Sequence, residues 1–274
     1  PLSVDMYDDK VYERAHDTLW KWVEDGKFLT EDKKCYYLYE LTMNGRVQTG
    51  VAACASIDDY ENGVIKKHEN TRAEKEIDRI RHVDVCNAQT GPIFLAYRAN
   101  DGIRRIVEKT KQGEPEYDFT SEDGVRHRVF VIREDADITA IHEAFAGIDS
   151  IYIADGHHRA ASAVKVGQKR RKEHPGYTGE EEFNYFLSVL FPDDELMIMD
   201  YNRVIRDLNG YSFKGLYREV EKRFDVEEIT GAKDTRPKER GTFCMYMEGH
   251  WFSCHIRQED RTPEDPVADL DVSI

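Results

Sequence analysis

The densest group of chemically active side chains in this sequence is a run of five residues. It contains an acid, a glycine, two imidazoles and a guanidinium, in the order Asp155, Gly156, His157, His158 and Arg159. A short isoleucine-rich run precedes it, typical of a buried strand, and an alanine-rich segment with strong helix propensity follows. The sequence therefore predicts a strand-to-helix loop that carries all five residues.

A loop of this kind is suited to binding anions. The start of a helix leaves backbone N–H groups unpaired at the positive end of the helix dipole, where phosphate binds readily. Gly156 lets the backbone approach a ligand, and Arg159 can hold a phosphate through two hydrogen bonds. His157 and His158 add further donors. A structural interpretation competes with this one, in which Asp155 caps the helix and the other side chains are solvated.

A second reactive group lies in residues 65–79, which contain few apolar positions. His68 and Glu69 supply the imidazole and the carboxylate that a general acid–base pair needs. A helix beginning near residue 71 would carry a basic face formed by Arg72, Lys75 and Arg79. A solvated helix held by ion pairs explains the same pattern, so both interpretations stay open.

Composition restricts the partners that this chain can have. Its 274 residues carry a formal net charge of −15, which argues against nucleic acid and anionic membranes as partners and leaves a small-molecule substrate. Five scattered cysteines without a CxxC pair are typical of reduced thiols in a cytoplasm. No apolar run reaches membrane-spanning length, and no signal peptide is visible. The sequence leaves the oligomeric state open.

Strand and helix patterns alternate with hairpins along the chain. Turn signals at Asn44-Gly45, Asp123-Gly124 and Glu248-Gly249 predict three hairpins, the last within residues 241–257. A fourth hairpin is expected from residues 185–191 and 196–201, which would bring Arg203 toward the same cleft as the loop. The expected fold class is α+β, a mixed and mostly antiparallel sheet with flanking helices.

The expected organisation is one large α+β domain or two intimately packed lobes, about residues 1–180 and 181–274. The chain begins at Pro1 without a methionine and ends within a pattern, which predicts an internal fragment of a longer protein. The sequence contains no GxxxxGK[ST] loop, no GxGxxG opening a helix, no GxSxG and no HExxH. The familiar kinase and hydrolase folds that use these motifs are therefore not expected.

Several stretches together resemble the bacterial family called domain of unknown function 1015, over most of the chain. Members of that family have further sequence at both ends, which agrees with the expected fragment. The stretches are residues 152–163 (YIADGHHRAASA), 67–71 (KHENT), 78–79 (DR), 58–60 (DDY) and 202–204 (NRV).

The loop also resembles, more distantly, the phosphate-binding signature of the ParB/sulfiredoxin-like fold, and in particular its free serine kinases. That resemblance implies that Asp155 positions a metal ion or the acceptor hydroxyl. It further implies that Gly156, His157 and Arg159 hold the transferred phosphoryl group. Those kinases also need a carboxylate base, for which Glu69 is the candidate here.

The leading functional hypothesis is phosphoryl transfer to a small hydroxyl metabolite with Mg²⁺, free L-serine being the expected acceptor. The donor is left open among ATP, ADP and pyrophosphate. One alternative is a metal-dependent phosphohydrolase whose metal ligands are Asp155, His157, His158 and His68. Another is a non-catalytic nucleotide-binding switch module.

Overall fold

The computed structural model describes residues 4–69, 73–231 and 233–261, and the chain forms two compact units, Pro1–Ile198 and Met199–Ile274. In the first unit, eight strands form one sheet in the order β3-β7-β4-β8-β2-β1-β6-β5. In that order their bounds are Ile65–Lys66, Ile151–Asp155, Ile93–Tyr97, Tyr185–Pro192, Arg46–Ser56, Tyr36–Met43, Arg126–Ile132 and Tyr117–Thr120.

The pairs β3–β7 and β4–β8 are parallel, and the other five strand pairs of this sheet are antiparallel. The predicted fold class, α+β with a mixed and mostly antiparallel sheet, is confirmed. The hairpin predicted at Asn44-Gly45 is also confirmed, because both residues adopt positive φ angles and join β1 to β2. Asp123-Gly124 likewise lies between β5 and β6, which pair antiparallel.

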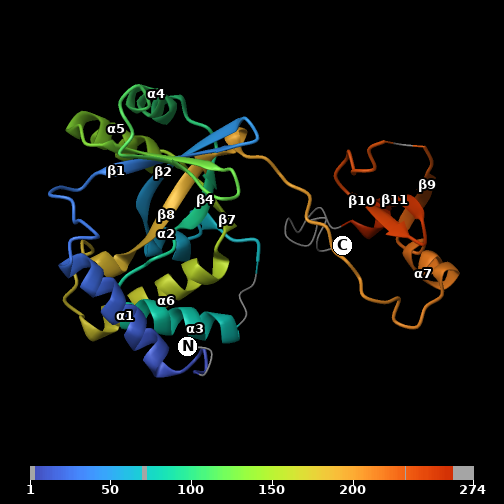
Figure 1. Ribbon diagram of the computed structural model, residues 1–274, viewed down its shortest axis with the longest axis horizontal. Coiled ribbons are helices and arrows are strands. Elements are labelled where there is room, and N and C mark those ends of the chain that lie inside the picture. The colour runs from blue at the N-terminus through green and yellow to red at the C-terminus, as the bar shows by residue number, and fades with distance from the viewer. Residues whose placement is uncertain (1–3, 70–72, 232, 262–274) are drawn as a thin grey trace. The chain divides into compact units, whose positions relative to one another are not determined.

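Helices cover both faces of this sheet (Figure 1). On one face lie α1 (Asp9–Glu24), α3 (Ala73–Cys86) and α6 (His157–Glu173), and α3 packs against both of the others. On the other face lie α4 (Asp101–Thr110) and α5 (Asp135–Ala146). The short elements of this unit are α2 (Ile57–Glu61), η1 (Glu182–Asn184) and η2 (Asp193–Glu195).

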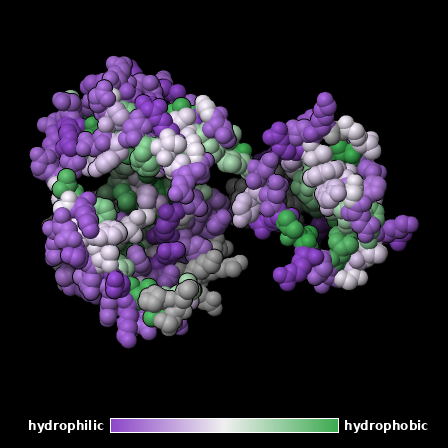
Figure 2. All heavy atoms as spheres, viewed as in Figure 1, coloured by the Kyte–Doolittle hydropathy of each residue, from purple (hydrophilic) through white to green (hydrophobic). Residues whose placement is uncertain are grey.

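The apolar core lies between these helices and the sheet. Leu38, Ile153 and Phe186 supply fully buried side chains from three different strands. Helix α4 buries the stripe Ile103, Ile106 and Val107, whose spacing of three and four residues is that of one helix face. On the face of the molecule shown in Figure 2, hydrophilic residues predominate over this unit. Among the described residues, none of the helices is both long and apolar enough to cross a membrane.

The hairpin predicted for residues 185–201 is wrong in its second half. Strand β8 pairs with β2 along one edge and with β4 along the other, so a strand from residues 196–201 has no edge to join. Those residues form no strand, and the Ile198 side chain is fully exposed.

The second unit has its own small core. Strands β9 (Phe224–Ile229), β10 (Thr242–Met247) and β11 (His250–Ile256) form an antiparallel sheet in the order β10-β11-β9. Helix α7 (Phe213–Val220) contributes apolar side chains to a cluster with the buried Phe252, and η3 (Gln258–Asp260) follows the last strand. The hairpin predicted for residues 241–257 is confirmed.

Candidate functional site

The parallel pairing of β3 with β7 brings the two reactive groups of the sequence together. Ile65 lies opposite Ile151 and Lys66 opposite Tyr152. Because both strands run in the same direction, the residues that follow them emerge at the same edge of the sheet. His68 and Glu69 follow β3 after one intervening residue, and the loop begins at Asp155, the last residue of β7.

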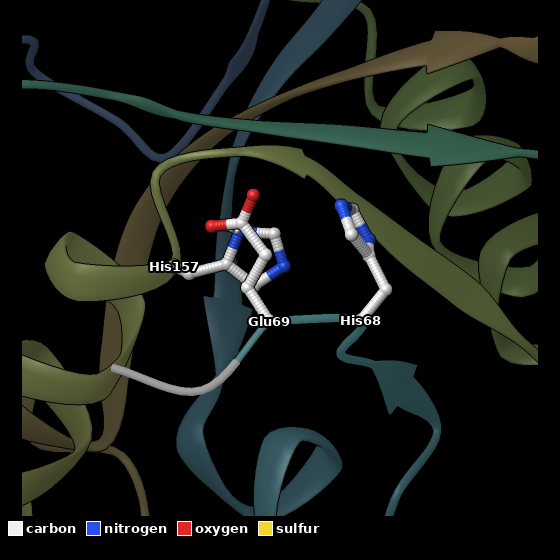
Figure 3. Close-up of side chains that lie close together, drawn as sticks. All are labelled: His68, Glu69 and His157. Atoms are coloured by element: carbon white, nitrogen blue, oxygen red, sulfur yellow. Dashed lines mark ion pairs between the residues drawn. The ribbon is translucent and has the colours of Figure 1, made fainter. Parts of the chain in front are cut away.

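Three side chains meet at this edge (Figure 3). The rings of His68 and His157 lie edge to face, with their centroids 4.4 Å apart. Oε2 of Glu69 lies 3.6 Å from Nδ1 of His157. One ligand atom from each of the three residues fits within a mutual distance of 4.8 Å. A segment 85 or more residues earlier in the chain therefore contributes an imidazole and a carboxylate to the loop.

His157 is the buried member of this group. Its side chain is only 5% exposed, although it occupies the first position of α6. Burial lowers the pKa of its imidazole, and the neighbouring His68 lowers it further, against the opposing influence of Glu69 and Asp155. These influences together lower the pKa, which favours the neutral form of the ring. Its Nε2 atom is buried and has no hydrogen-bond partner among the residues that the structure describes.

The Arg159 side chain stabilises the loop through two hydrogen bonds. Its Nη2 atom donates to Oδ2 of Asp155 at 2.5 Å, and its Nη1 atom donates to the backbone oxygen of Pro92. The interpretation in which Asp155 caps the helix is wrong, because the N-cap residue of α6 is Gly156. Asp155 instead ends β7, with a side chain that is 72% exposed.

Gly156 allows the tight turn into α6. Its φ angle is +97°, a conformation that residues with a side chain rarely adopt. After this turn, the backbone N–H groups of the first helical residues point away from the start of the helix. A Cβ atom at this position would lie 2.9 Å from Nη2 and 3.0 Å from Nε of Arg159. The guanidinium thus occupies the space that a side chain would need.

We expect Gly156→Ala to destabilise the protein by about 1–3 kcal/mol, the typical cost of a non-glycine residue held in a sparsely populated backbone region. The new methyl group also forces Arg159 away from Asp155 and Pro92. Urea unfolding measures the loss. Gly176→Ala is the matched control, because its φ is not in the left-handed region and its Cβ would meet nothing within 4 Å. Equal stability of the two variants would contradict this account of the loop.

The remaining predicted site residues are placed as follows. His158 is half-buried on the first turn of α6, where its backbone oxygen accepts a hydrogen bond from Ser162 at 2.6 Å. Arg72 lies outside the described residues. Arg203 belongs to the second unit, where its guanidinium lies 5.3 Å from the ring centroid of Tyr201. Its expected contribution to the loop stays a prediction.

One group of the site, a backbone carbonyl, could not be identified from the sequence. The carbonyl of Pro92 holds Arg159, and any residue type supplies a carbonyl, so only the position of β4 beside β7 identifies it. Gly91 precedes it, and a Cβ there would make ordinary contacts of 3.6 Å with Arg159.

The architecture defines a mixed α+β protein with a strand-loop-helix site at one edge of its sheet. The chain belongs to the family described as protein of unknown function (DUF1015), whose family model matches residues 2–273. The family assignment made from the motifs is therefore confirmed. Comparisons with curated proteins and with solved structures gave no match.

Proposed function

We propose that this protein transfers a phosphoryl group to the hydroxyl of a small metabolite, with free L-serine as the acceptor. The position of Glu69 beside the loop supports this function most directly. Phosphoryl transfer requires donors that neutralise the phosphate charge and a base that receives the proton of the attacking hydroxyl. The loop supplies the donors, and Glu69, with a side chain that is 60% exposed, supplies a carboxylate that substrate can reach.

The reaction divides between these groups as follows. The backbone N–H groups at the start of α6 and the side chain of His158 bind the terminal phosphate of the donor. The serine oxygen attacks the phosphorus, and its proton passes to Glu69. The bond from phosphorus to the bridging oxygen breaks, and its electron pair stays with the shortened donor. Phosphoserine is released, and Glu69 returns the proton to water.

Asp155 is the residue that fits a Mg²⁺ ion. Magnesium takes one or two protein carboxylates and keeps several water molecules, and Asp155 is an exposed carboxylate at the helix start. When bound, the ion would neutralise charge on the donor phosphates. Arg159 pairs with Asp155, and this pair fixes the position of the carboxylate at the start of the loop.

We include a cytoplasmic location in this proposal, because all five cysteines are free thiols and the cytoplasm keeps thiols reduced. Two of them, Cys86 and Cys254, are buried. Burial raises the pKa of the Cys254 thiol to about 11, so this group is inert as a nucleophile at neutral pH.

Phosphoserine formation tests the proposed activity. Purified protein is incubated with L-serine and Mg²⁺, and separately with ATP, ADP or pyrophosphate, and the product is identified by mass spectrometry. We expect phosphoserine with one of these donors. L-Alanine, which lacks only the hydroxyl, is the matched control and gives no phosphorylated product. Absence of phosphoserine with every donor contradicts the proposal.

Release of inorganic phosphate distinguishes the alternatives in the same assay. Phosphate released equally with serine, with alanine and without an amino acid would favour a phosphohydrolase. Nucleotide binding without turnover would favour a switch module.

A further inference from the structure

The group formed by His68, Glu69 and His157 has the composition of a transition-metal site. Two imidazoles and one carboxylate form the ligand set of several zinc enzymes that keep one coordination position open. Imidazole favours zinc and related metals, whereas Mg²⁺ prefers ligand sets made of oxygen atoms. This set is therefore distinct in chemistry from the Asp155 carboxylate to which Mg²⁺ is assigned above.

The distances allow such a site after small side-chain rotations. In a tetrahedral zinc site, bond lengths of about 2.0 Å place neighbouring ligand atoms about 3.3 Å apart. Here the ligand atoms lie within 4.8 Å of one another. His68 and Glu69 are exposed, so their side chains can rotate toward a metal while His157 stays fixed by burial.

The state of His157 agrees with this role. Its side chain is only 5% exposed, and its ring lies edge to face against that of His68, with the centroids 4.4 Å apart. The ring also has a buried nitrogen without a hydrogen-bond partner among the described residues. The unsatisfied Nε2 atom carries a desolvation cost, which a metal ion bound to that nitrogen would remove.

We propose that His68, Glu69 and His157 bind one divalent transition-metal ion, with Zn²⁺ as the probe. A metal bound there coordinates the carboxylate of Glu69, which then cannot accept a proton. Metal binding and phosphoryl transfer therefore exclude each other. This second consequence depends on the function proposed above, whereas the metal site itself does not.

Zn²⁺ binding to the full chain is measured by titration calorimetry, with no substrate present. We expect one ion per chain. His68→Ala should weaken binding at least about 10-fold, since changes beyond the ligands themselves already cost about 10- to 100-fold in affinity. His68 is exposed, so this variant is expected to fold normally. His142→Ala is the matched control, because His142 is exposed on α5, and it should bind as the wild type does.

The outcomes separate the two parts of the proposal. No stoichiometric binding by the wild type, or equal affinity in His68→Ala, overturns the metal site whether or not the protein is a kinase. With the site established, Zn²⁺ added to the Mg²⁺-dependent assay should inhibit phosphoserine formation. The Zn²⁺ concentration for half-inhibition should rise at least about 10-fold in His68→Ala, relative to that variant's own rate without zinc. Zinc that raises the rate would overturn the exclusion.

Discussion

Glu69→Gln is expected to slow phosphoserine formation by about 10²- to 10⁴-fold, the usual contribution of a positioned general base. Glutamine keeps the size and the hydrogen-bonding oxygen of the side chain but cannot accept the proton. Glu69 is largely exposed, and its Oε2 atom lies 3.6 Å from Nδ1 of His157, so the fold should not depend on its charge. Surface substitutions of this kind change stability by about 0.5 kcal/mol or less.

Initial rates at saturating serine and donor measure the effect, and thermal unfolding checks that the variant is intact. Glu143→Gln is the control, since this residue is an exposed glutamate of α5, on the other face of the sheet from α6. It should react at the wild-type rate. A Glu69→Gln rate within about 10-fold of wild type would remove Glu69 from the role of base, even if phosphoserine is the product.

Glu40→Ala is expected to destabilise the first unit by about 3 kcal/mol, the lower end of the cost of breaking a buried ion pair. Glu40 is 1% exposed and lies on β1, where it binds Nζ of Lys111 at 2.9 Å and Nε of Arg128 at 2.7 Å. Burial acts to raise the pKa of its carboxyl, but the hydrogen bonds from the two cations outweigh burial and lower it. Alanine leaves both cations without their shared anion.

Thermal unfolding followed by circular dichroism measures this loss. For a unit of this size, each kcal/mol corresponds to about 2–4 °C, so the midpoint should fall by about 6–12 °C. Glu143→Ala is the control and should leave the midpoint nearly unchanged. If the unfolding midpoint of Glu40→Ala equals that of Glu143→Ala, the ion pairs of Glu40 make no net contribution to the stability of the unit.

The Glu40 cluster shows why part of the fold could not be predicted. Its three charged residues come from β1, α4's C-cap and β6, and each is unremarkable within its own stretch of sequence. Charges far apart in the chain become neighbours only through strand order, which local patterns do not encode. The same holds for residues 196–201, whose apolar character predicted a strand although both edges of β8 are occupied.

Local signals did determine several elements. Asn44, Gly45 and Gly249 adopt the positive φ angles that their hairpin turns need, because asparagine and glycine tolerate that conformation and a turn involves only adjacent residues. Glu248 also has a positive φ angle, which its residue type does not favour. The alternation of β7, with Ile151 and Ile153 buried and Tyr152 exposed, likewise follows from the two-residue period of a strand.

The sequence alone determined that residues 155–159 form a turn from a strand into a helix. Such a turn depends only on residue types and propensities within about ten positions. Tertiary structure decided that Gly156 rather than Asp155 is the N-cap, and that the Asp155 side chain pairs with Arg159. It also decided that His68 and Glu69 join His157. The physical reason is the parallel register of β3 and β7, a contact between segments 86 residues apart that no local pattern contains.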